Sequence, residues 1–232
     1  MAPMRRSAIV IGALYLITHV TSVAGLALYG PVLTSTTYAD YLADPGAASR
    51  ALLGGFLEVV LSLAIVGTGV AWYPIIKRIN EGMALGYAAL RTLEAAIIAV
   101  GVTPLVAAVS LAQRSGAAGN ETLVQTLASL HNWTFLIGPS FVCGTNTVVL
   151  AAVLLRSALV PRFIPILGLV GGPLVFASGV AQMFGAMPQA SPGAALAAIP
   201  VFAWEVSLAL FLVIRGFRPA GQRAASTQAV VA

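Results

Sequence analysis

The chain has 232 residues, of which 59% are hydrophobic and only 8% are charged. A soluble domain carries roughly 25% charged residues, so this composition excludes a soluble globular protein. The net charge of +5 comes from Lys and Arg residues spread along the chain. This spread is typical of membrane topology signals, and we expect no nucleic-acid partner.

Six apolar segments are each long enough to cross a bilayer, because a helical span takes about 20 residues. None of them shows the alternation of polar and apolar residues that a barrel strand requires. We therefore predict an all-α, polytopic membrane helix bundle whose main partner is the lipid bilayer. The spans are predicted at residues 7–29, 51–76, 83–110, 127–155, 163–186 and 195–214.

The domain organisation is simple, since the loops are short and no internal repeat is evident. We predict a single transmembrane helical domain over residues 1–218. The polar segment 219–232 is predicted to be a disordered cytoplasmic tail. The sequence leaves open whether the chain forms a homo-oligomer.

The Lys and Arg residues of the loops are unevenly divided between the two faces of this topology. Nine lie on the side of the termini, and only Arg50 and Arg114 lie on the opposite side. Cytoplasmic loops of membrane proteins are enriched in Lys and Arg. This distribution predicts a multi-pass protein of the cell membrane with cytoplasmic N and C termini.

Ionisable side chains inside the predicted spans are the candidates for chemistry. Each is costly in hydrocarbon and is tolerated mainly where it faces the protein interior. A buried acid beside a base can exchange protons with a bound molecule, so we predict that these residues form an acid–base site. The candidates are His19, Glu58, Arg91, Glu94, His131 and Glu205.

Within this set, the charges predict one internal ion pair and two glutamates without a partner cation. Arg91 and Glu94 are three residues apart and share one helical face, which predicts an internal ion pair. Every other Lys or Arg lies at a predicted interface, so Glu58 and Glu205 are expected to have no fixed cation. We expect them to be protonated or to bind a positively charged group.

Neutral polar and aromatic side chains in the spans complete the predicted site. The rise of 1.5 Å per residue allows six polar residues to share a layer between the midplane and the outer leaflet, namely His19, Glu58, Glu94, His131, Gln182 and Glu205. The predicted substrate-lining residues are Phe56, Tyr87, Asn132, Asn146, Gln182 and Trp204.

Three functions are compatible with these residues. A buried Glu/His site can act on a lipophilic small molecule as an isomerase or cyclase does. The same side chains would serve a proton-coupled transporter of a small hydrophobic compound. In a structural or accessory membrane protein they would only join helices together. We expect no cofactor or metal, because no ligand motif such as HExxH occurs and Cys143 is the only cysteine.

A family resemblance is carried by three stretches, LYLITHVTSVAGLALYGPVL, GGFLEVVLSLAIVGTGVAWYPIIKR and NEGMALGYAALRTLEAAIIAVG. They resemble the bacterial membrane proteins of domain-of-unknown-function family 4386, over most of the chain and more weakly after residue 190. The resemblance implies that His19, Glu58, Arg91 and Glu94 occupy signature positions, and it implies no activity. A looser similarity, in architecture alone, is to the small membrane-bound terpene cyclases of fungal meroterpenoid pathways, which look to use intramembrane acidic residues as proton donors.

Overall fold

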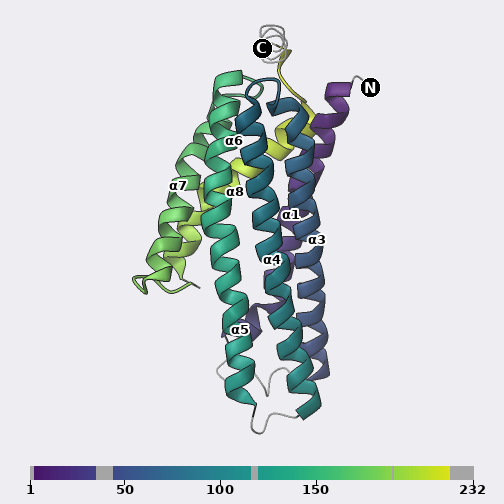
Figure 1. Ribbon diagram of the computed structural model, residues 1–232, viewed down its shortest axis with the longest axis vertical. Helices are drawn as coiled ribbons and strands as arrows, with labels where there is room; N and C mark the ends of the chain where they lie inside the picture. The colour runs from purple at the N-terminus through teal and green to yellow at the C-terminus, as the bar shows by residue number, and fades with distance from the viewer. Residues whose placement is uncertain (1–2, 35–43, 116–119, 190, 220–232) are drawn as a thin grey trace.

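The computed structural model describes residues 3–34, 44–115, 120–189 and 191–219. All regular secondary structure in these ranges is helical. Six helices are long and apolar enough to cross a membrane, which confirms the predicted all-α bundle with six spans (Figure 1). The predicted cytoplasmic tail lies, after Pro219, outside the described residues.

The six spans run up and down through one bundle. The first three are α1 (Pro3–Thr34), α3 (Pro45–Ile76) and α4 (Glu81–Ser115). The fourth continues from α5 (Glu121–Leu136) through a π-helical segment, η1 (Ile137–Val142), into α6 (Cys143–Ser157). The last two are α7 (Phe163–Met183) and α8 (Pro192–Ile214).

Local sequence signals explain where two of these helices begin. The Asp44 carboxylate accepts a hydrogen bond from the Ala47 amide at 2.7 Å and caps α3. The Ser191 hydroxyl accepts one from the Ala194 amide at 3.2 Å and caps α8. Each cap is followed by proline, which has no amide hydrogen to leave unsatisfied in the first turn.

The start of α1 and the end of α8 lie at the same end of the bundle, here called the terminal end (Figure 1). The Arg5 guanidinium fastens the two helices there, donating to the carbonyls of Leu212 at 3.0 Å and Val213 at 2.7 Å. A large apolar core that includes Trp72 and Trp204 fills the bundle toward this end. The opposite end of the long helices is called the far end below.

The α7–α8 hairpin is shorter than the rest of the bundle and ends well before the far end (Figure 1). These helices have 21 and 23 residues, against 32 each in α1 and α3. At 1.5 Å per residue the difference is about 15 Å. Polar side chains are exposed on the longer helices near the far end, among them Arg50, Arg114 and Gln125. The long helices therefore continue past the α7–α8 hairpin and exceed the predicted spans at this end.

Two glycines allow α6 and α7 to approach closely. A β-carbon at Gly172 would lie 2.7 Å from the carbonyl oxygen of Gly144, and one at Gly144 would lie 2.8 Å from that of Gly172. Without side chains the two backbones can meet directly, as small residues commonly permit in membrane helices. Apolar side chains such as Val20, Leu63 and Val70 point outward, which fits contact with a lipid bilayer.

Candidate functional site

A cavity of about 830 Å³ lies inside the bundle, bounded by α1, α3, α4, the α5–η1–α6 helix, α7 and α8. Its wall is mostly apolar. Val23 of α1 and Phe202 of α8 line it and are both exposed, so the cavity is open to the outside beside these residues. Ser191 and Pro192 extend the lining to the α7–α8 connection.

The π-helical segment forms one wall of this cavity through Pro139 and Ser140. Proline lacks an amide hydrogen, so Pro139 cannot donate to the carbonyl four residues earlier, and the regular α-helical ladder is interrupted there. Such π-helical insertions are frequent at functional sites. Here the segment widens the helix opposite α8, where the cavity lies.

Four ionisable side chains, His19, Arg91, Glu94 and Glu205, line the inner part of the cavity and are called the central cluster. Arg91 and Glu94 form the predicted ion pair, with Nη1 3.0 Å from Oε2, which confirms that prediction. The same Nη1 lies 3.7 Å from Oε1 of Glu205 across the bundle. One guanidinium therefore faces two carboxylates, one on its own helix and one on α8.

Neutral groups from three helices hold this ion pair in place. Arg91 Nε donates to the Thr68 hydroxyl of α3 at 2.9 Å. The Asn146 amide of α6 donates to Glu94 Oε2 at 2.7 Å. The guanidinium carbon of Arg91 lies 5.4 Å from the centre of the Tyr15 ring, a cation–π contact. Arg91 is only 2% exposed, so its charge interacts mainly with these partners and little of it is accessible from the cavity.

Tyr15 also fixes the orientation of His19 one helical turn later. His19 Nδ1 lies 2.9 Å from the Tyr15 carbonyl oxygen. A carbonyl can only accept, so Nδ1 carries a proton in this contact, whether the ring is neutral or charged. Nε2 is consequently the nitrogen that gains or loses a proton, and it lies 3.6 Å from Glu205 Oε2.

Glu205 is the least satisfied member of the central cluster. Its oxygens lie 3.6 Å from His19 Nε2 and 3.7 Å from Arg91 Nη1, and no hydrogen bond reaches it from the described part of the chain. The side chains of His19 and Glu205 are 14% and 12% exposed, toward the cavity. The expectation that Glu205 has no fixed cation is wrong, because Arg91 reaches it from α4.

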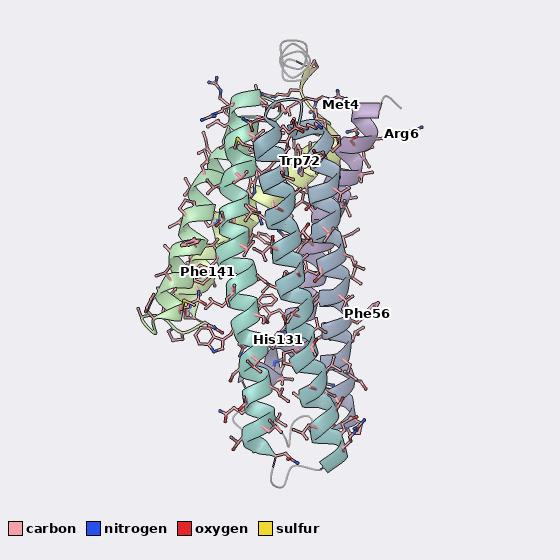
Figure 2. All side chains as sticks on the ribbon, in the orientation of Figure 1. Met4, Arg6, Phe56, Trp72, His131 and Phe141 are labelled. Carbon is pink, nitrogen blue, oxygen red and sulfur yellow. The ribbon has the colours of Figure 1, made fainter. Side chains whose placement is uncertain are left out.

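A second ionisable pair lies outside the cavity. His131 Nε2 is 3.0 Å from Glu58 Oε2, and both side chains are buried. The Tyr29 ring meets the His131 ring edge-on at 4.9 Å between centroids, and Tyr29 also lines the cavity. Figure 2 shows His131 inside the half of the bundle nearer the far end.

The six predicted acid–base residues therefore form two groups in place of one site. On α3, Glu58 precedes Thr68, a partner of the central cluster, by ten residues, and Tyr29 follows His19 by ten on α1. Along a helix this corresponds to about 15 Å. The central cluster lies near the middle of the bundle, and Glu58–His131 lies toward the far end.

A family model described as "Domain of unknown function (DUF4386)" matches residues 10–216. The chain belongs to the DUF4386 family. No curated protein and no solved structure matches it. The DUF4386 match covers the central cluster and the Glu58–His131 pair, but the family description supplies no reaction or ligand.

The predicted lining residues of this DUF4386 protein are divided by the structure. Asn132 and Gln182 line the cavity, and Gln182 donates to the Ser178 hydroxyl at 2.9 Å. Asn146 acts through Glu94, as described above. Tyr87 bonds the Tyr15 hydroxyl at 2.7 Å, and both it and Trp204 are buried in the core outside the cavity. Phe56 is 60% exposed on the outer face of α3 (Figure 2).

Sequence reasoning missed Thr68 and Tyr29 among the polar contacts of this DUF4386 protein. Threonine is common in membrane helices, so Thr68 gave no signal of its role beside Arg91. Tyr29 lies at the predicted end of the first span, where tyrosine is usually an interfacial anchor.

Within the described ranges, no group of three His, Cys, Asp or Glu residues is arranged to hold a metal ion.

Proposed function

We propose that this protein binds a lipophilic small molecule in the cavity and performs acid–base chemistry on it, in the manner of an isomerase or cyclase. The observation that carries the proposal is the pairing of Glu205 and His19 Nε2. The Glu205 carboxylate and the Nε2 atom of His19 both face the cavity, and neither group forms a hydrogen bond within the described part of the chain. Groups in this state are available to a ligand, whereas Arg91 and Glu94 are already engaged.

The geometry suggests roles for the two groups. His19 Nε2 acts as the base, because the Tyr15 carbonyl keeps the other nitrogen protonated. The Glu205 carboxylate stabilises the imidazolium that His19 then becomes, 3.6 Å away. His19 gives this proton back to a second atom of the ligand, so an isomerisation consumes no net proton. Arg91 is a positioning residue for Glu205.

The surroundings support a lipophilic substrate. The cavity wall is mostly apolar, and Val23 and Phe202 at its edge are exposed apolar side chains. A volume of about 830 Å³ falls within the range of sites that enclose drug-sized molecules. A dry enclosure also shields a reactive intermediate from water.

A proton-coupled transporter is the second candidate, favoured by the position of the central cluster near the middle of the bundle. Such a protein would have to open the apolar core that includes Trp72 and Trp204, which closes the route to the terminal end. We propose further that the terminal end is cytoplasmic and that the membrane is the cell membrane. The excess of Lys and Arg in the loops at that end supports this orientation.

Native mass spectrometry in mild detergent tests the proposal. We would compare the wild type with Glu205→Gln and with Glu81→Gln, a matched change at an exposed glutamate. The expected result is a co-purifying lipophilic compound in the wild type and in Glu81→Gln that is reduced or lost in Glu205→Gln. Bare protein in all three samples would contradict ligand binding and favour a structural or accessory role.

The co-purified compound then separates the two candidates. Incubated with fresh protein in detergent, it is converted to a product if the protein is an enzyme, because no membrane gradient is needed. If the compound is unchanged in detergent but moves across proteoliposome membranes with a pH gradient, the transporter is supported and the enzyme is refuted.

A further inference from the structure

We infer that the polar group of the ligand is a cation, such as a protonated or quaternary amine on a lipophilic body, and that its binding displaces a proton from the central cluster. This inference rests on the proposed binding site. It goes beyond it by naming the charge of the molecule that the cavity takes.

Charge balance in the central cluster is the first step. One guanidinium, on Arg91, stands among two carboxylates, on Glu94 and Glu205. The cluster therefore carries one negative charge in excess unless a proton sits on His19 or on a carboxylate. An uncompensated charge is costly in the interior of a membrane helix bundle. Either a proton or a cationic ligand can supply the missing positive charge.

The position of this missing charge is the second step. Arg91 lines the cavity but is almost fully buried and is bound to Thr68 and Glu94, so little of its charge is open to a molecule in the cavity. Glu205 is the member of the central cluster with the weakest polar contacts, and its carboxylate can accept several hydrogen bonds. A cation in the cavity would contact Glu205 directly, whereas an anion would meet the same carboxylate and be repelled.

The groups that face Glu205 leave no other site for the balancing charge. From α1 come His19 and Tyr15, and from α4 come Arg91, Glu94 and Tyr87. Near the cavity, α6 contributes the neutral Cys143 and Asn146, and α7 contributes the neutral Ser178 and Gln182. Among these described groups only His19 and the carboxylates can hold an exchangeable proton at neutral pH.

Aromatic rings at the cavity provide a second kind of contact for a cation. Phe202 lies one turn before Glu205 on α8, lines the cavity and packs edge-on against His19 at 4.9 Å between centroids. Phe135 and Tyr29 line the wall on α5 and α1. A ring face attracts an alkylammonium group, and this attraction does not depend on a hydrogen bond.

The test measures binding and proton release together. Protein in nanodiscs of zwitterionic phosphatidylcholine is titrated with decyltrimethylammonium, and with decanol and decyl sulfate as neutral and anionic probes of the same chain length. Because the quaternary ammonium has no proton to lose, any acid released into weak buffer comes from the protein. Empty nanodiscs give the background for partition into lipid.

We expect decyltrimethylammonium to bind at least about tenfold more tightly than decanol, a free-energy difference of about 1.4 kcal/mol. We expect about one proton to be released for each bound cation, and the affinity to fall as the pH is lowered, because protons compete for the same charge. Glu205→Gln should lose the preference and the proton release, and Glu81→Gln should keep both.

The outcomes separate the inference from the proposed function. Equal binding of the ammonium and the alcohol, without proton release, would overturn the inference and leave the lipophilic site intact. No saturable binding of any probe would count against both. The pH dependence of the wild type tests the inference without a variant, so poor folding of Glu205→Gln would not leave it undecided.

Discussion

The Nε2 atom of His131 lies 3.0 Å from the carboxylate of Glu58, and both side chains are buried between α5 and α3. No Lys or Arg among the described residues forms an ion pair with this carboxylate. The two residues must therefore share a proton if the pair is to be uncharged in total. They join α3 and α5, which are distant in sequence, and they lie nearer the far end than the central cluster does.

Glu58→Leu is expected to lower the free energy of unfolding by about 3 kcal/mol, because it leaves His131 buried without its partner. Glu58→Gln should cost less, since the amide can still form a hydrogen bond with Nε2. Thermal unfolding of purified protein in detergent measures both changes. Equal losses in the two variants would show that packing, and not the polar contact, stabilises this region.

Arg91→Leu is expected to be among the most destabilising single changes, by about 3 to 5 kcal/mol, because it leaves Glu94 and Glu205 without their shared cation. Adding Glu94→Gln and Glu205→Gln to Arg91→Leu should recover part of this loss, since no unpaired charge then remains. Folded yield and unfolding midpoints of the single and triple variants check the prediction. A triple variant that is less stable than Arg91→Leu would contradict the charge account.

The sequence predicted the architecture well, because a bilayer imposes a length and an apolar composition on every span. All six spans are found, including the fourth, although its π-helical segment was not foreseen. The Arg91–Glu94 pair was also predictable, since both residues lie on one helix three positions apart. The sequence was thus reliable for the position of a residue along its own span and for the spacing of residues within one helix.

Contacts between helices could not be predicted in the same way. The reach of Arg91 to Glu205 depends on how α4 and α8 face each other, which no spacing within one helix reveals. Phe56 and Glu58 are two residues apart, yet one faces outward and the other is buried, because their directions differ by about 200° around the helix. The rotation of each helix is set by packing, and it decides which polar residues share a cavity.

Gly172→Ala is expected to destabilise the bundle by about 1 to 3 kcal/mol. Its β-carbon would lie 2.7 Å from the carbonyl oxygen of Gly144, so α6 and α7 would have to separate. Gly86→Ala is the matched control, because nothing lies within 4 Å of its β-carbon. That change should be neutral or slightly stabilising, as alanine favours a helix more than glycine does. Similar unfolding curves for both variants would refute the close contact.

Ala198→Phe is expected to narrow the cavity and weaken ligand binding while the fold is retained. Ala198 lines the cavity on the same face of α8 as Phe202 and Glu205, four and seven residues later. Ile199→Phe is the matched control, since this neighbouring side chain is exposed on the outer surface. Titration with decyltrimethylammonium should show at least about a tenfold loss of affinity, or about 1.4 kcal/mol, for Ala198→Phe and little change for Ile199→Phe. If the two variants bind the probe equally well and unfold alike, the ligand does not occupy the part of the cavity beside α8, and the role proposed for Glu205 would fall with it.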